Sequence, residues 1–448
     1  MTAPEGGLYR ALVWSLAALL GATGVLLMIQ MIGAEIGPFR FAELGSRDPR
    51  SRVGLWLGAA NGAQRWRVLL GNAGAVRDVG SLEALDPAEL GVVVLPEPRE
   101  IGAREFVLLQ EFLAGGGGVV LTGSIGVRGP DGSWRGYELM RALLGAEVIA
   151  LDPERAQAVV AARRGPLSAP LLPRERVAVA REPGLPGLAQ AGSELVWSAA
   201  LESANLALDA AGPLADATSA PAASLRREVG RGRLAWLAVG PERVARGADP
   251  QPLGDALRAA VAWAARQPFV EVLPWPGGAP FAASLDAQGA PPPDSVAAQR
   301  ALEAEIATAS ASGGLARLRV PADWLAAGEG QRAFADELAQ RGAWLATRSE
   351  LSSWTRERAS VQATVRRAGP QRLVVAVTNR APSQARGVAL RIYLNEPARS
   401  ASVEATQLLQ AAPGLRFQPA AESLDLALPE LAPRASAAFT LDYEPAAG

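Results

Sequence analysis

The sequence contains no cysteine and no histidine, and the printed chain shows no lysine, so every basic side chain is an arginine. These absences exclude the Ser-His-Asp and Cys-His nucleophiles, a Schiff-base lysine and a phosphate-loop lysine. They also exclude disulfide bonds and zinc sites built from thiolates and imidazoles. The chemistry left to an enzyme is that of carboxylates, or of an oxygen-lined site for a hard cation such as magnesium or calcium.

Neither positive nor negative side chains are in excess in this sequence. The net charge is -1 over 448 residues, and 49% of the residues are hydrophobic. A chain this close to neutral has no electrostatic footprint for nucleic acid, so we expect no nucleic-acid partner. The length predicts two to four domains at about 150 residues each.

One long uncharged run lies near the start of the chain. Residues 11–33, "ALVWSLAALLGATGVLLMIQMIG", contain no charged side chain. As a helix they would be about 34 Å long, enough to cross a hydrocarbon core of roughly 30 Å. A cleaved signal peptide has a shorter apolar core of about 7–15 residues. The sequence therefore predicts a short tail (1–10), a transmembrane signal anchor (11–33) in contact with membrane lipid, and a linker (34–51).

The orientation of this predicted anchor is left open by charge alone. Arg10 precedes the run, whereas four arginines follow it by residue 52. The positive-inside rule, counted this way, keeps the following domains in the cytoplasm, although large translocated domains often override such counts. The family resemblances described below favour an extracytoplasmic location, and a single-pass membrane protein with extracytoplasmic domains is the predicted localisation.

Residues 52–267 alternate between strand-like and helix-like patterns. The run "GVVVLPEP" (91–98) is continuously apolar, as a strand covered on both faces must be. The stretch "REFVLLQEFLAGGGG" (104–118) places its apolar residues on one helical face, and "VVLTGSIG" (119–126) is the next strand and turn. Short links between strand and helix predict an open parallel sheet.

The segments "DPAELGVVVLPEP", "LLQEFLAGGGGVVLTGS" and "RGRLAWLAVGPE" carry a resemblance to the class I glutamine amidotransferase-like superfamily. In its catalytic members the nucleophile elbow reads Gly-x-Cys-x-Gly. The corresponding residues here are 122–126, "TGSIG", so Ser124 stands in the position of the cysteine. No histidine exists to activate it, and we interpret Ser124 as a relic position in a turn.

Residues 268–358 carry a second resemblance. The segments "FVEVLPWPGGAPFAASLDAQG" and "FADELAQRGAWLATRSELSSW" resemble the beginning and the end of a polysaccharide deacetylase domain, and the short middle predicts a shortened α/β barrel remnant. In that family one aspartate is the base and the next binds metal. Asp286 keeps the first position, but Ala287 replaces the second and the histidine ligands are absent. Asp286 is therefore interpreted as a relic or a turn aspartate, and no metal is predicted.

Four tryptophans and two glutamates of this segment have alternative interpretations. The tryptophans could stack on sugar rings, or fill a small core, which we favour because buried aromatics dominate core energetics; they are Trp275, Trp324, Trp344 and Trp354. Glu303 and Glu305 lie two positions apart on a predicted helix and should point to different faces, which is a poor geometry for paired acid-base catalysis.

The last segment, residues 359–448, contains short alternating strands separated by turn residues, for example "RLVVAVTNR" and "GVALRIYLN". It predicts an antiparallel, immunoglobulin-like β-sandwich.

Together these features predict a pseudoenzyme without cofactor or metal. The predicted function is a membrane-anchored, non-catalytic scaffold or glycan-binding component of a polysaccharide-handling system in the cell envelope, with other envelope proteins or polysaccharide as partners. Two alternatives remain open: an auxiliary subunit of a membrane transporter, and a glycan-acting enzyme that uses carboxylates.

Overall fold

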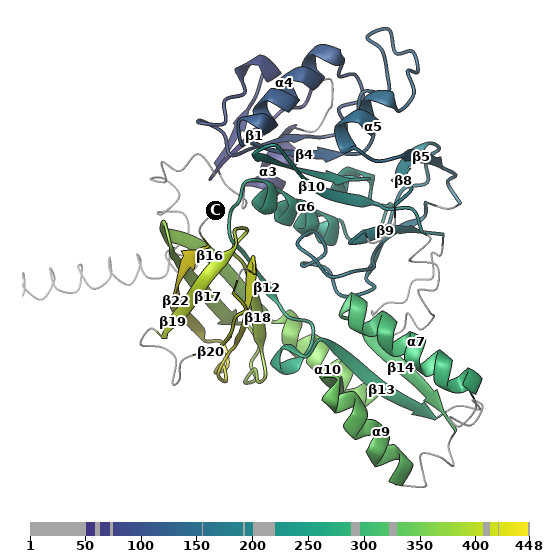
Figure 1. Cartoon of the computed structure of the whole chain (residues 1–448), viewed down its shortest axis with the longest axis vertical. Coiled ribbons are helices and arrows are strands. Elements are labelled where there is room, and N and C mark those ends of the chain that lie inside the picture. Colours follow the sequence, from purple (N-terminus) through teal and green to yellow (C-terminus); the bar gives the residue numbers. More distant parts are fainter. Residues whose placement is uncertain are drawn as a thin grey trace, which may run out of the picture.

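The computed structural model describes residues 51–58, 63–71, 75–154, 156–190, 193–199, 220–287, 296–321, 329–405, 413–419 and 421–446. These residues form a large α/β unit, a smaller α/β unit and a β-sandwich, seen in Figure 1 at the top, lower right and lower left. Three clusters of buried apolar side chains form the core: one lies in the large unit, one in the small unit, and one in the sandwich, where Ala282 and Leu315 of the small unit join it.

A six-stranded sheet carries the large unit. All neighbouring strands are parallel except at one edge, where β10 runs antiparallel to β11. Val92 to Leu95 in β3 are fully buried, because helices cover both faces of the sheet. In spatial order the strands are β10 (Ser224–Val229), β11 (Gly232–Leu237), β4 (Gly118–Thr122), β3 (Val92–Leu95), β1 (Arg52–Leu55) and β2 (Ala75–Asp78).

Helices pack on the two faces of this sheet (Figure 1). On one face α3 (Ala63–Leu70) contacts α6 (Gln251–Ala264), and on the other α4 (Ala103–Ala114) contacts α5 (Glu138–Leu144). The α4 helix begins where the Glu105 carboxylate accepts a hydrogen bond of 3.0 Å from the backbone N–H of Gly102.

Five short strands lie between α5 and β10 in the sequence. They form a two-stranded and a three-stranded sheet whose apolar side chains, such as Val159 and Trp197, join the same core as the large sheet. The strands are β5 (Val148–Leu151), β6 (Ala158–Ala161), β7 (Arg176–Ala178), β8 (Leu185–Leu188) and β9 (Leu195–Ser198).

The small α/β unit does not form a barrel in the residues that the structure describes. Its three parallel strands, in the order β14-β13-β15, make an open sheet, whereas a barrel requires the first and last strands to pair. The predicted barrel remnant is corrected accordingly. The elements are β13 (Phe281–Ala287), α7 (Val296–Ser312), β14 (Leu315–Val320), α9 (Glu329–Gln340) and β15 (Ala343–Leu345).

The β-sandwich recruits a strand from before the small unit. Strand β12 (Phe269–Val272) pairs with β18 (Ala389–Tyr393), and α10 (Arg348–Ala359) contributes Leu351 and Trp354 to the sandwich core. Residues 268–358 therefore supply two units. The sheets are β12-β18-β21-β20 and β16-β17-β22-β19, with β16 (Val361–Gly369), β17 (Arg372–Asn379), β19 (Ala398–Ala405), β20 (Gly414–Arg416), β21 (Ser423–Ala427) and β22 (Ser436–Pro445).

The predicted fold class began with a transmembrane helix, and here the prediction is wrong. Among the described residues no helix has the length and apolar character needed to span a bilayer. The longest of them, α7, has 17 residues and includes Arg300, Glu303 and Glu305, whereas a span needs about 20 predominantly apolar residues. The predicted single-pass membrane localisation is corrected with it. Residues 11–33, to which the prediction applied, lie outside the described residues.

Candidate functional site

The elbow at residues 122–126 follows β4 at the carboxyl edge of the parallel sheet, where ligand sites of such sheets form. Gly123 and Gly126 have φ angles of 62° and 60°, which an L side chain rarely adopts, so the turn depends on glycine. Ser124 is buried, and the indole N–H of Trp236 donates a 2.9 Å hydrogen bond to the carbonyl of Gly123. The chain turns here as predicted, but around a buried serine.

Glu97 lies directly against this elbow. It follows β3 with a φ of 39°, and its backbone N–H donates a 3.2 Å hydrogen bond to the Thr122 hydroxyl. A Cβ on Gly123 would lie 2.7 Å from Cγ of Glu97. Arg243, in the short 3-10 helix η3 (Pro241–Arg243), donates two hydrogen bonds of 2.7 Å to the Glu97 carboxylate. An ion pair therefore lies beside the relic position Ser124.

Glu242 is the titratable group of this edge with the clearest shift. Burial of its carboxyl group raises its pKa to about 7, and the neighbouring charge of Glu97 acts in the same direction. Although Glu242 as a whole residue is exposed to solvent, its carboxyl group folds back against Gly240. Glu97 and Glu242 were not singled out in the sequence analysis, because their approach depends on loops that follow different strands.

Asp286, the other relic position, lies near the end of β13 and is half buried. Its register partner on the parallel strand β14 is Arg319. The turn that follows, from residue 288, lies outside the described residues. In the described part of the chain, no group of three or more aspartate or glutamate side chains is arranged to hold a metal ion.

The core-filling interpretation of the tryptophans is confirmed for Trp275 and Trp354, which are 5% and 6% exposed. Their indole N–H groups donate to the carbonyls of Gly313 and Pro274, and the Trp344 ring contacts both. Trp324 lies outside the described residues.

The two glutamates of α7 point to different neighbours, as predicted. Glu303 accepts hydrogen bonds of 2.8 and 2.9 Å from Arg341, whereas Glu305 lies 3.5 Å from Arg174. They form no acid-base pair.

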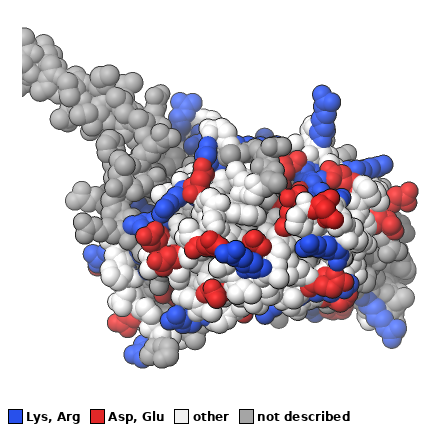
Figure 2. Space-filling view, turned by 90° about the horizontal axis from the view of Figure 1, so that it is seen from above, with Lys and Arg blue, Asp and Glu red and all other residues white. Residues whose placement is uncertain are grey.

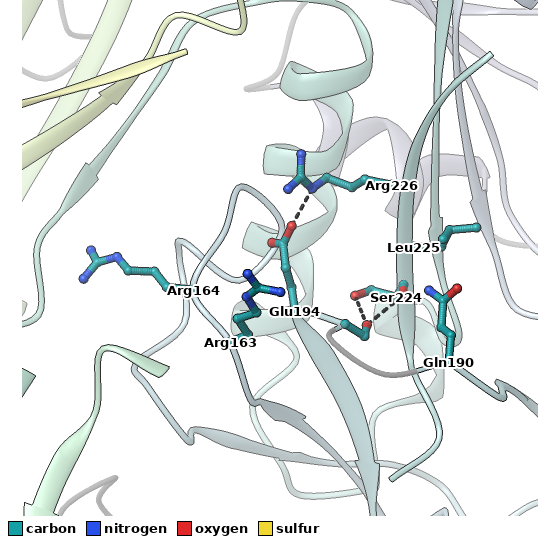
Figure 3. A pocket seen from close by; sticks show the side chains of 8 residues that line it. Arg163, Arg164, Gln190, Glu194, Ser224, Leu225 and Arg226 are labelled. Atoms are coloured by element: carbon teal, nitrogen blue, oxygen red, sulfur yellow. Dashed lines mark hydrogen bonds and ion pairs between the residues drawn. The ribbon is translucent and has the colours of Figure 1, made fainter. Parts of the chain in front are cut away.

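A pocket of about 260 Å³ lies where the strands inserted after α5 meet β10 (Figure 3). Seven of its eight lining residues carry polar or charged side chains, three of them guanidinium groups. They are Arg163, Arg164, Gln190, Ser193, Glu194, Ser224, Leu225 and Arg226. A hollow with this lining can bind a small polar ligand through many hydrogen bonds.

Glu194 organises the floor of this pocket. One carboxylate oxygen accepts hydrogen bonds from the backbone N–H groups of Leu167 (2.6 Å) and Ser168 (3.1 Å). The other accepts from Nε of Arg226. A side chain at Gly165 would collide with this carboxyl group, so the glycine is needed for the close approach. The charge of Glu194 is thereby compensated on both oxygens.

The arginines of the pocket differ in their surroundings. Arg226 lies over the indole ring of Trp263, with Cζ 5.1 Å from the ring centroid. Figure 3 shows the guanidinium groups of Arg163 and Arg226 close to Glu194, whereas Arg164 extends away from them. Arg164 forms an ion pair with the buried Glu271 of β12. The pocket wall is thus connected to the β-sandwich.

The sequence offered weak signals for this pocket. Arg163 and Arg164 are adjacent, as are Arg226 and Arg227, and Glu194 directly precedes the apolar strand β9. Only the antiparallel pairing of β6 with β9 and of β10 with β11 brings them together.

An exposed tryptophan lies in the loop after the elbow. Trp134 is 59% exposed and its ring meets Tyr137 edge-on, with centroids 5.2 Å apart. The loop is ordered by Asp131, which accepts hydrogen bonds from the backbone and hydroxyl of Ser133. Unlike the buried rings of Trp275 and Trp354, this ring is exposed and can stack on a sugar.

Charges of both signs are interspersed on one face of the molecule. Figure 2 shows arginine and acidic side chains intermixed over the described residues of the face in view. This distribution agrees with the net charge of -1.

No protein family matches this sequence, and no curated protein matches it. Among solved structures, a β-galactosidase from Rahnella sp. R3 aligns with 87% of this chain and 40% of its own, at 12% identity and a TM-score of 0.33. An α-L-fucosidase from Paenibacillus thiaminolyticus aligns with 88% of this chain and 48% of its own, at 11% identity and a TM-score of 0.31.

A ThuA-like protein from Bacteroides uniformis aligns with 49% of this chain and 94% of its own, at 13% identity and a TM-score of 0.31. This chain spans less than half the length of the two glycoside hydrolases. Scores and identities this low do not establish a common overall fold with any of the three proteins, and they imply no shared activity.

Proposed function

We propose that this protein is a non-catalytic carbohydrate-binding protein, built from degenerate amidotransferase-like and deacetylase-like units. The observation that carries the proposal is the pocket around Glu194, whose lining is almost wholly polar and whose floor is held by hydrogen bonds. Sugars present hydroxyl groups around a ring, and guanidinium, amide and hydroxyl side chains complement them.

The surroundings of the two relic positions support a non-catalytic role. Ser124 is buried beside the Glu97–Arg243 ion pair, and the chain has no histidine to accept its proton. Asp286 is followed by Ala287 where the deacetylase motif has a metal-binding carboxylate. Among the described residues, neither position has the partners that its chemistry requires.

Titration calorimetry with defined oligosaccharides tests the proposal. We expect the full chain to bind at least one of cellotetraose, galactotetraose and tetragalacturonate, with no release of reducing sugar or acetate during prolonged incubation. The variant Ser124→Ala should bind as the wild type does. Turnover of any of these glycans, abolished by Ser124→Ala or Asp286→Asn, would show that the protein is an enzyme.

A second variant separates the two candidate sugar contacts. Trp134→Ala removes the exposed ring without touching the pocket, because Trp134 lies in the loop after the elbow. If the pocket is the binding site, this variant should keep the wild-type affinity, whereas Gln190→Ala should weaken it. The reverse result would move the binding site to the loop.

A further inference from the structure

We propose that the pocket around Glu194 selects an acidic sugar residue, whose anionic group is bound by the guanidinium groups of Arg226 and Arg163. This inference rests on the proposed carbohydrate-binding function and adds the chemical class of the ligand. The anionic group is a carboxylate, as in a uronic acid, or a sulfate ester.

The charged side chains that line the pocket favour an anionic ligand. Three arginines and one glutamate line the pocket. The carboxylate of Glu194 already accepts from two backbone N–H groups and from Arg226, so it is compensated and offers little repulsion to an anion. Arg164 is balanced by Glu271 outside the pocket. Guanidinium groups therefore outnumber carboxylates in the lining by three to one.

The orientation of the Arg226 guanidinium group also favours an anionic ligand. Within the described residues its ion pair with Glu194 uses Nε, which leaves the two Nη groups at the end of the fork for a ligand. A guanidinium group offers parallel N–H donors that match the oxygens of a carboxylate or sulfate. Figure 3 shows Arg163 reaching the same region from the loop after β6.

The side chains of the pocket are held in place by their neighbours before a ligand binds. The plane of Arg226 is supported by the Trp263 ring below it and by Glu194 beside it. The hydroxyls of Ser193 and Ser224 lie 3.0 Å apart, and Ser193 also donates to the carbonyl of Ser224 or of Leu195. Side chains fixed before binding lose little conformational entropy on binding, which favours affinity for a small ligand.

Alternation along β10 supplies a matched control. Ser224 and Arg226 are two positions apart and face the pocket, whereas Arg227 points to the opposite face and lies against Gly145. Arg227→Gln therefore removes the same charge from the same strand without altering the pocket.

The experiment compares tetragalacturonate, its methyl ester and a sulfated galactose tetrasaccharide by titration calorimetry on the full chain. The ester keeps the sugar backbone and removes the charge. We expect tetragalacturonate to bind about tenfold to a hundredfold more tightly than its ester, with a preference that weakens at high salt. Tighter binding of the sulfated sugar would identify a sulfate ester as the preferred group.

The variants Arg226→Gln and Arg163→Gln should each abolish most of this preference, and Arg227→Gln should keep it. Arg163→Gln leaves the hydrogen bonds of Glu194 with Leu167, Ser168 and Arg226 intact, so it tests the inference even if Arg226→Gln fails to fold. Equal binding of tetragalacturonate and its ester, or an unchanged preference in Arg163→Gln, would overturn the acidic selectivity while leaving the carbohydrate-binding function standing. If inorganic sulfate binds but none of the oligosaccharides does, the carbohydrate-binding function itself is overturned.

Discussion

Arg243 donates hydrogen bonds of 2.7 Å from both Nε and Nη2 to the carboxylate of Glu97. Its third nitrogen forms an ion pair with Glu182. One guanidinium group therefore joins the end of β3, the helix η3 and the loop before β8. Both partners of the central pair are largely buried, with 13% and 17% of their side chains exposed.

Replacing Arg243 should destabilise the protein strongly. Arg243→Gln removes the two 2.7 Å hydrogen bonds to the largely buried Glu97 carboxylate and leaves Arg99, whose Nη2 lies 3.3 Å away, as its remaining ion-pair partner. We expect a loss of about 2–3 kcal/mol in the free energy of unfolding, measured with urea. The control is Arg372→Gln, which breaks the exposed Arg372–Asp442 pair and should cost much less, because solvent screens that pair. Equal losses in the two variants would show that the buried pair has no special role.

The elbow should not tolerate a side chain at residue 123. Gly123→Ala places a Cβ 2.7 Å from Glu97 at a φ of 62°, so steric overlap adds to backbone strain. We expect a loss of about 2–4 kcal/mol. Gly132→Ala is the control, because its φ is 80° but no atom lies within 4 Å of the added Cβ. Its loss should be about 1 kcal/mol from backbone strain alone, and a similar loss at both positions would contradict the predicted overlap.

The raised pKa of Glu242 predicts a pH-dependent effect. Because burial raises this pKa from 4.5 to about 7, the folded state holds a proton that the unfolded state has released between these values. The stability contribution of Glu242 is therefore present below pH 4.5 and is lost as the pH rises through 7. Glu242→Gln should match the wild type at pH 5 and exceed it at pH 8.

The expected gain is at most about 1 kcal/mol, because the partly exposed carboxyl group is screened by solvent. Urea unfolding at both pH values measures it. A variant that is less stable than the wild type at pH 8 would show that the charged carboxylate is stabilised in the fold.

Asp286 should behave as a structural residue. Asp286→Asn removes one charge beside its cross-strand neighbour Arg319, a pair that is worth about 0.2–1 kcal/mol on a sheet. We expect a change in thermal unfolding of that size, with no loss of oligosaccharide binding. Stoichiometric metal in the purified wild type, absent from the variant, would instead mark Asp286 as a ligand.

Several features could be read from the sequence because they depend on composition or on short-range pattern. The absence of histidine, cysteine and lysine excludes several chemistries whatever the fold is. The apolar runs 92–95 and 119–122 are buried strands, and the alternation in residues 372–379 is a strand with one buried face. The local spacing of residues determines such elements, since it decides which side chains share a face.

The tertiary structure alone decided which distant segments meet. Arg163, Glu194 and Arg226 come from three separate segments, and no local pattern joins them. Strand β12 precedes the small unit in sequence, yet it pairs with β18 of the sandwich, where Glu271 binds Arg164 and Tyr393. Strand partners and the side chains that face a pocket depend on long-range packing, which local sequence patterns do not encode.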